Sequence, residues 1–205
     1  MKISLTNCGK RFNREWIFRK FSYEFISGQT YAITGPNGSG KSTLLQVIAG
    51  ALVTSEGKIS YEINSNEKAA DEVFRHISIA APYLEVVEEM TLMEFLKFHQ
   101  QFKPFLPGTD INQTVARVGL ATSAHKQIRY YSSGMKQRVK LIQAVLSDVS
   151  CVFLDEPCTN LDQEGISMYQ QLIKDYKGNR TIIVSSNDLQ EYGFCEQTIR
   201  IQDYK

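Results

Sequence analysis

The sequence lacks several features that would place the chain in a membrane, outside the cell or on nucleic acid. No stretch of about 18 or more apolar residues is present to span a bilayer. The first residues, MKISLTNCGKRF, lack the long apolar segment of a secretory signal. Lys and Arg number 23 against 22 Asp and Glu, a formal net charge of +1, so no global basic field favours nucleic acid. We therefore expect a cytosolic protein with no nucleic acid among its partners.

Metal-site and disulfide patterns are also lacking. The four cysteines show no CxxC spacing and the three histidines fall in no ligand-like motif; they are Cys8, Cys151, Cys158, Cys195, His76, His99 and His125. Because zinc sites and disulfide frameworks need clustered ligands, we expect free buried thiols, and histidines that pack or face solvent. Internal repeats, low-complexity tracts and linkers are missing too, so the 205 residues predict one domain, 1–205, with subdomains.

Short β-rich runs alternate with helical patterns along the chain. Strands are predicted at Thr30–Thr34, Cys151–Asp155 and Thr181–Ser185, and helices from Lys41 and from Gln163. This alternation is typical of βαβ units around a mainly parallel sheet, the α/β class. The first thirty residues indicate an antiparallel β subdomain instead. Residues of about 83–140 read as helical, which predicts a helical insertion into the α/β core.

The segment GPNGSGKST, residues 35–43, carries the most specific signal. It follows the apolar strand TYAIT and precedes a helical pattern, as a GxxxxGK[ST] phosphate loop (Walker A) requires. Its glycines allow backbone N–H groups to turn toward phosphate oxygens, and the helix adds its positive N-terminal end. The loop residues are Gly35, Pro36, Asn37, Gly38, Ser39, Gly40, Lys41, Ser42 and Thr43. Lys41 is expected to reach the β and γ phosphates and Ser42 to bind Mg²⁺.

The run CVFLDE places two acids at the end of an apolar strand. Ligands of α/β sheets bind at the carboxyl ends of the strands, where these acids stand. Asp155 is predicted to hold Mg²⁺ together with Ser42, and Glu156 to polarise the attacking water in phosphoryl transfer. Solvated acids at a strand end are the alternative interpretation of this pattern.

The run YSSGMKQR, residues 131–138, precedes another helical pattern. Ser132 and Gly134 suit a helix start whose free N–H groups could face an anion. Taken alone, the run indicates only a helix N-cap.

In sequence order, GPNGSGKST, YSSGMKQR, CVFLDEP and TNLD resemble the ATP-binding subunit of ABC transporters over nearly the whole chain. The resemblance implies a P-loop NTPase core and a dimer in which Ser132, Ser133 and Gly134 contact ATP held by the partner's phosphate loop. It implies that Asp162 helps to build the dimer seam. It also implies an aromatic residue that stacks on adenine, for which Phe12 is the candidate and Trp16 the second choice; a core aromatic is the alternative for Phe12.

Several positions depart from that family pattern. Tyr83 replaces a glutamine, and we expect it to pack, although its phenol could bond a water. The run YSSGMKQR, residues 131–138, stands where the family has its signature motif and is called the signature run below. In it Tyr131, Ser133 and Met135 differ from the family's residues, while Gly134 remains. Asn187 replaces a histidine that contacts the γ-phosphate; it can donate a hydrogen bond but carries no charge, so transition-state stabilisation is reduced. With Glu156 present, slow ATP hydrolysis is predicted.

These residues predict an ATPase that binds ATP and Mg²⁺, pairs with a second ATP-binding subunit, and drives a separate integral-membrane permease at the cytoplasmic face of the membrane. The helical region at 83–102 would receive the permease, or else pack on the core. Two alternatives stay open: a non-transport ABC ATPase, such as an iron–sulfur assembly factor or another clamp, and a weakly active regulatory ATP binder.

Overall fold

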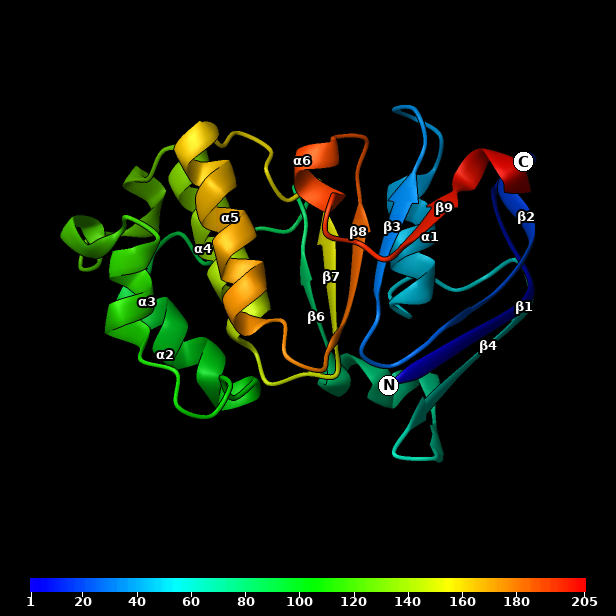
Figure 1. Ribbon diagram of the computed structural model, residues 1–205, viewed down its shortest axis with the longest axis horizontal. Coiled ribbons are helices and arrows are strands. Elements are labelled where there is room, and N and C mark those ends of the chain that lie inside the picture. Colours follow the sequence, from blue (N-terminus) through cyan, green and yellow to red (C-terminus); the bar gives the residue numbers. More distant parts are fainter.

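A computed structural model describes all residues, 1–205, and is built around a five-stranded parallel sheet (Figure 1). The strand order is β6-β7-β8-β3-β9, with bounds β3 Thr30–Thr34, β6 Ile77–Ala80, β7 Cys151–Asp155, β8 Thr181–Ser185 and β9 Gln197–Arg200. The predicted strands β3, β7 and β8 are thus confirmed at their predicted bounds, as is the α/β class. The carboxyl ends of these three strands point to one edge of the sheet.

Both faces of the parallel sheet are covered, which explains why its central strands are apolar throughout. In β7, Cys151 and Phe153 belong to the cluster that also holds residues of α1 (Lys41–Ile48). Val152 and Leu154, on the other face, pack with residues of α4 (Ser133–Leu146) and α5 (Gln163–Tyr176). The alternation follows from the two-residue period of a strand. It fixes the strand so that Asp155 reaches the carboxyl edge.

A second, antiparallel sheet lies beside α1, as the first thirty residues predicted. Its strand order is β2-β1-β4-β5, with bounds β1 Lys2–Phe12, β2 Glu15–Phe25, β4 Glu56–Ile63 and β5 Asn66–Lys68. Aromatic side chains of β2 share one apolar cluster with α1 and the parallel sheet, so the two sheets sandwich the helix that follows the phosphate loop. Strands β4, β5 and β9 were absent from the prediction.

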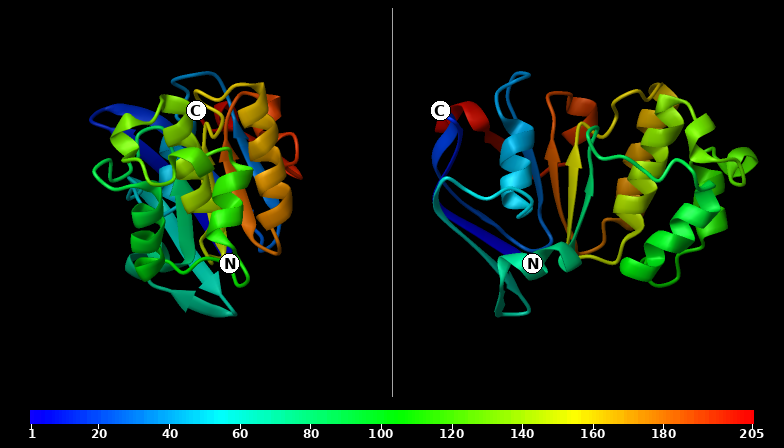
Figure 2. Two further views of the ribbon diagram at one scale, coloured as in Figure 1. Left: turned by 90° about the vertical axis from the view of Figure 1, so that its left-hand side faces the viewer. Right: turned by 180° about the vertical axis from the view of Figure 1, so that it is seen from behind.

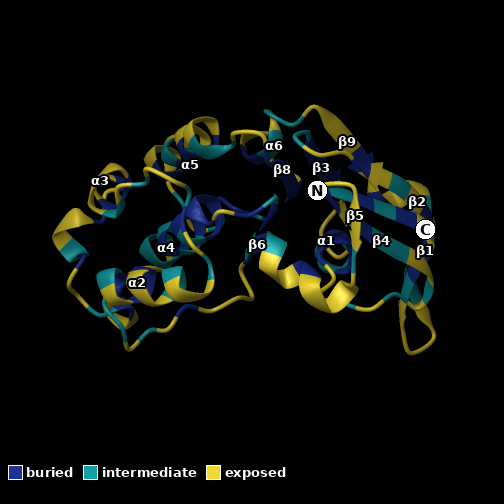
Figure 3. Cartoon of the chain, turned by 90° about the horizontal axis from the view of Figure 1, so that it is seen from below, coloured by how far each residue is buried: buried dark blue, intermediate teal, exposed yellow.

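The helical part stands at the opposite end of the molecule from the antiparallel sheet (Figure 2). It comprises α2 (Leu92–Phe102), α3 (Ile111–Arg117), α4, and short 3₁₀ turns at Ala121–Ser123 and Ile128–Tyr130. It has its own apolar cluster, which runs from Val86 to Leu146, and buried residues gather along its inner helix faces (Figure 3). None of the helices combines the length and apolar character needed to cross a membrane.

The remaining elements are short. They are α6 (Leu189–Tyr192) and the 3₁₀ turns η1 (Ala70–His76) and η4 (Ile201–Tyr204). Helix α6 packs beside β8, immediately after the segment that carries Asn187.

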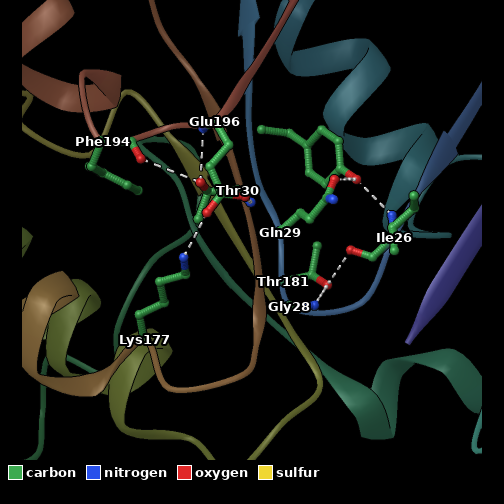
Figure 4. Close-up of polar contacts among 9 residues, drawn as sticks. Ile26, Gly28, Gln29, Thr30, Lys177, Thr181, Phe194 and Glu196 are labelled. Carbon is green, nitrogen blue, oxygen red and sulfur yellow. Dashed lines mark hydrogen bonds and ion pairs between the residues drawn. The ribbon is translucent and has the colours of Figure 1, made fainter.

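Side-chain bonds hold the edge of the parallel sheet opposite the phosphate loop (Figure 4). The Thr30 hydroxyl accepts a bond from the Glu196 N–H at 3.0 Å, and Thr30 N–H donates to the Glu196 carboxylate at 3.3 Å. Lys177 pairs with the same carboxylate at 3.3 Å. The Thr181 hydroxyl accepts from Gly28 N–H at 3.2 Å. These bonds fix the amino ends of β3 and β8, and thereby the positions of their carboxyl ends.

Candidate functional site

The phosphate loop joins β3 to α1, and Lys41 folds over it. The Lys41 ammonium donates to the carbonyl oxygens of Gly35 at 2.9 Å and Pro36 at 3.3 Å, and the residue is only 5% exposed. Gly40 precedes the helix with φ 97°, and a Cβ there would lie 2.2 Å from Ile17 Cγ2. Only glycine fits both the backbone conformation and this close approach.

Helix α1 begins without a side-chain cap, unlike the other α-helices. Thr91, Asp110, Ser132, Asp162 and Asp188 each accept an N–H bond at the start of their helices. At α1 no side chain caps the helix, and its first turn holds no acidic residue. The free N–H groups and the positive end of the helix dipole are therefore available to an anion. Ser42 and Thr43 lie in this first turn, and Asn37, Gly38 and Ser39 in the loop before it.

Buried polar atoms without hydrogen-bond partners gather beside the loop. They are Ser39 Oγ, Asp155 Oδ1 and Ser185 Oγ. Asp155 and Ser185 are paired residues at the ends of β7 and β8, and Asp155 is 1% exposed. Burial raises the pKa of Asp155, whereas the nearby hydroxyls of Ser42 and Ser185 lower it by a smaller amount. Buried polar atoms are normally paired, so these oxygens suit a cation or phosphate ligand.

Ser185 was missed by the sequence reasoning. The signal was present, because TIIVSS ends at the same sheet edge as CVFLD.

Glu156 follows Asp155 in a left-handed backbone conformation, with φ 43°. Its N–H donates to the Ser185 carbonyl oxygen at 2.9 Å, so the backbone turns away from β7 while staying tied to β8. A left-handed glutamate is uncommon, and such conformations concentrate at functional sites. The turn places Glu156 at the carboxyl edge of the sheet, next to Asp155.

Asn187 lies against the phosphate loop. Its Oδ1 accepts from the Gly35 N–H at 3.1 Å, and its Nδ2 donates to Asn37 Oδ1 at 3.1 Å. The structure therefore brings Lys41, Asp155, Glu156 and Asn187 to one edge of the sheet from three different strand ends.

Tyr83 follows β6 at the border between the sheet and the helical part. It is 47% exposed and belongs to none of the three apolar clusters, so only part of its surface packs against the protein. Burial, and then the negative charge of Asp155, raise the pKa of Tyr83 to about 12, whereas a bond to Gln46 lowers it. The phenol thus stays protonated at neutral pH and can donate a hydrogen bond near Asp155.

The signature run forms the start of α4. Ser132 caps the helix by accepting from Met135 N–H at 3.2 Å, and both Ser132 and Ser133 are exposed. Tyr131 is 5% exposed and donates its hydroxyl to the Ser123 carbonyl at 2.6 Å, which explains its place in the helical cluster.

This helix contacts β6 and β7, whereas the phosphate loop follows β3 on the other side of β8. The structure thus does not bring the signature run to the phosphate loop of its own chain.

Three further predicted residues lie at the surface, two of them exposed and one half-buried. Phe12 ends β1, is 48% exposed, and has Lys10 Nζ 5.1 Å from its ring centroid. Trp16 is half-buried beneath the Arg19 guanidinium, 4.2 Å from the ring. Asp162 caps α5 by accepting from Gly165 N–H at 2.8 Å, with its side chain 72% exposed. Because Phe12 is about half exposed, the alternative that it is a core aromatic is wrong.

The cysteines and histidines lie largely as expected. Cys8, Cys151 and Cys158 are buried free thiols and Cys195 is half-buried. The His99 ring packs between Phe95 and Phe105 in the helical part.

Comparisons with known proteins show which family this chain resembles over most of its length. A family model described as ABC transporter matches residues 18–159. The uncharacterized ABC transporter ATP-binding protein YybJ of Bacillus subtilis is 29% identical over 90% of this chain and 85% of its own. The cytochrome c biogenesis ATP-binding export protein CcmA of Agrobacterium fabrum is 31% identical, over 91% of this chain and 88% of its own.

Solved structures share the fold. A putative ABC transporter ATP-binding protein from Pyrococcus furiosus aligns over 100% of both chains, with a TM-score of 0.81 and 20% identity. The ATP-binding cassette MJ0796, a dimer in a post-hydrolysis state bound to ADP and Pi, aligns over 97% of this chain and 94% of its own, with a TM-score of 0.79 and 21% identity.

Proposed function

The chain belongs to the ABC transporter family as an ATP-binding subunit, and on that basis we propose that residues 35–43, with Asp155, Glu156 and Asn187, bind ATP·Mg²⁺ and hydrolyse the ATP slowly. The observation that supports this assignment best is their convergence at one sheet edge, around an uncapped helix start and partnerless buried oxygens. The ATPase activity itself is that of the family.

Phosphate binding is assigned to the loop and to Lys41. The Lys41 ammonium would exchange its bonds to the carbonyls of Gly35 and Pro36 for bonds to phosphate oxygens, which are stronger because both partners are charged. Phe12 is exposed at the end of β1 and is assigned to stack on adenine.

Mg²⁺ binding is assigned to Ser42 and Asp155. Mg²⁺ prefers oxygen ligands and is usually held by one or two carboxylates together with substrate phosphates. The partnerless Asp155 Oδ1, beside the Ser42 hydroxyl, fits that donor set. When bound, the ion would neutralise phosphate charge.

Hydrolysis is assigned to Glu156, which would orient the attacking water. Asn187 would donate from Nδ2 toward the γ-phosphate end, giving up its bond to Asn37. Because the asparagine is neutral, it supplies less stabilisation than a cation, and the loss of one such group typically costs about 10²–10³ in rate. This supports slow turnover that depends on partners.

A second ATP-binding subunit is assigned to complete the site. The exposed Ser132 and Ser133 and the N-terminus of α4 would face the nucleotide of the partner subunit, with Asp162 at the seam. The separation of the signature run from the phosphate loop of the same chain supports this arrangement. In a single chain the exposed N-terminus of α4 would contact no nucleotide, whereas in a dimer it would face the partner's nucleotide.

The permease is assigned to the groove between the parallel sheet and the helical part. A cavity of about 430 Å³ opens there, lined by side chains that include Phe74 and Leu84. Phe74 is 58% exposed. On α2, Phe98 is 40% and Phe102 71% exposed, and their ring centroids lie 5.0 Å apart, so the two rings form an exposed apolar pair. Attachment here would hold the chain at the cytoplasmic face of the membrane.

Purification of the tagged chain from detergent-solubilised membranes tests the transporter role. Recovery with an integral-membrane protein is expected, and the double change Phe98→Ser and Phe102→Ser should reduce that recovery. Exposed Val53, whose carbonyl oxygen accepts from Lys10 Nζ of β1, gives the control Val53→Ser, which should leave that recovery unchanged. Recovery of only a soluble partner would contradict the permease assignment and favour a non-transport clamp.

A further inference from the structure

The peptide unit between Pro157 and Cys158 is held at both of its polar atoms by buried side chains. Gln137 Nε2 donates to the Pro157 carbonyl oxygen at 2.7 Å. Glu191 Oε1 accepts from the Cys158 N–H at 2.7 Å. Gln137 is 3% exposed and Glu191 5% exposed. This unit begins one residue after Glu156, so whatever holds it also limits where Glu156 can stand.

The two side chains come from α4, whose start would face the partner's nucleotide, and from α6, which follows the segment that carries Asn187. Gln137 lies in the first turns of α4, just after Gly134 of the signature run. Glu191 lies in α6, four residues after Asn187, which bonds Gly35 and Asn37. A single peptide unit therefore joins the helix that would face the partner's nucleotide to the turn that contacts the chain's own phosphate loop.

Glu191 is itself rigidly placed. Its backbone N–H donates to the Asp188 carbonyl at 2.9 Å, and its carbonyl accepts from the Tyr169 hydroxyl at 2.8 Å. Burial raises the pKa of Glu191, while the Ser186 hydroxyl and the Cys158 N–H lower it. A buried carboxyl group without hydrogen-bond partners destabilises the fold. The hydrogen bond from the Cys158 N–H therefore keeps the Glu191 side chain in place.

A second contact links α4 to the same segment. A Cβ on Gly134 would lie 2.8 Å from the Asn160 carbonyl oxygen, so the signature helix starts in direct contact with the loop after Glu156. That loop is internally bonded, with Thr159 N–H donating to the Glu156 carbonyl at 3.1 Å and Leu161 N–H to the Cys158 carbonyl at 2.9 Å. A shift of α4 would thus move the loop as a unit.

We propose that Gln137 and Glu191 are positioning residues that clamp the Pro157–Cys158 peptide, set the place of Glu156, and couple it to the signature helix and to the Asn187 turn. The inference rests on the proposed function, in which Glu156 orients the water. Neither side chain touches the nucleotide in this scheme. The clamp therefore controls turnover and leaves ATP affinity unchanged.

The test uses variants of matched volume in the full chain. Gln137→Met and Glu191→Met remove the polar group, whereas Glu191→Gln keeps an acceptor oxygen. Each methionine variant should lower kcat by about 10- to 10²-fold, the scale of a small misplacement of a catalytic group, with ATP affinity within about threefold of wild type. Because both hold one peptide unit, the double variant should be little slower than either single variant. Glu191→Gln should stay within about threefold of wild type.

A control separates clamping from general stability. Ser78 Oγ donates to the Ala144 carbonyl at 2.7 Å, a buried bond of the same length that ties α4 to β6. Ser78→Ala should lower the melting temperature without lowering kcat. If a methionine variant melts below the assay temperature, Gln137→Asn and Glu191→Asp, which shorten each arm by one methylene, should show the same loss of kcat at unchanged ATP affinity.

Two results would overturn the clamp: wild-type kcat in folded Gln137→Met and Glu191→Met, or a loss of rate in Glu191→Gln as large as in Glu191→Met. The failure of the proposed function has a different signature, since Glu156→Gln would then hydrolyse ATP as fast as wild type whatever the clamp variants do.

Discussion

The phosphate loop and the residues that complete the site are positioned in different ways. Residues 35–43 are contiguous, and the loop's own glycines, carbonyls and helix start give it its shape. Tyr83, Glu156 and Asn187 follow three different strands, and Asn187 reaches Gly35 across 152 residues of sequence. ATP affinity should therefore depend on a local motif, and turnover on how distant elements pack.

The departures from the family pattern fall on the second group. Tyr83 and Asn187 stand where the resemblance implies a glutamine and a histidine, while the loop keeps its full motif. We infer that ATP binding and ATP hydrolysis can be changed separately.

Lys41→Ala should weaken ATP binding by about 10²-fold, because two charge-assisted bonds to phosphate are lost. Isothermal titration calorimetry measures the affinity. Lys2, which pairs with Glu24 on the surface, gives the control Lys2→Ala, for which no change is expected. Equal affinities for the two variants would break the assignment of binding to the loop.

Asn187→His should raise kcat by about 10-fold, since a cationic donor restores part of the lost transition-state stabilisation. Asn187→Ala, which lacks both bonds to the loop, should lower kcat. Steady-state phosphate release at saturating ATP distinguishes them. A histidine variant no faster than wild type would show that the asparagine does not limit turnover.

Tyr83→Phe should lower kcat by about threefold, because the variant lacks the hydroxyl that would donate a hydrogen bond to water near Asp155. A threefold change is the scale of one neutral hydrogen bond. The ring, and with it any packing, is retained. An unchanged rate would return Tyr83 to the packing role that the sequence suggested.

The smallest effect concerns stability in the helical part. Burial between Phe95 and Phe105, and then the charge of Lys103, lower the pKa of His99 to about 4. The unfolded chain, with a histidine pKa near 6.5, binds the proton first as the pH falls from about 6.5 to 4. The free energy of unfolding should therefore decrease across that window.

We expect a decrease of about 1–2 kcal/mol from His99, after allowance for solvent screening of a half-buried ring. Urea denaturation at several pH values measures it, and His99→Phe should flatten this part of the profile. An identical profile in the variant would contradict the role of His99.

Much of the fold could be predicted because the signals were local. Strands β3, β7 and β8 are apolar runs with sharp polar ends, and they were placed at their observed bounds. Strand β9 is defined by its pairing with β3, and β4 by its pairing with β1, so neither has a comparable local signal. Three-residue β5 exists only as the partner of β4.

The site divides in the same way. The phosphate loop and the acidic strand end were readable as motifs. Gln137 and Glu191 were not, because a glutamine and a glutamate on polar-looking helical runs give no sign of burial until folding brings both to the Pro157–Cys158 peptide. Even Asn187, noticed as a departure, showed its bonds to Gly35 and Asn37 only in the structure.

Glu156→Gln separates ATP binding from ATP hydrolysis in one variant, because only hydrolysis depends on the Glu156 carboxylate. ATP affinity and the rate of phosphate release are measured on the same preparation, beside wild type and Lys41→Ala. The role assigned to Glu156 predicts ATP affinity within about threefold of wild type and phosphate release slower by about 10²–10³-fold. Phosphate release from Glu156→Gln at the wild-type rate would contradict it.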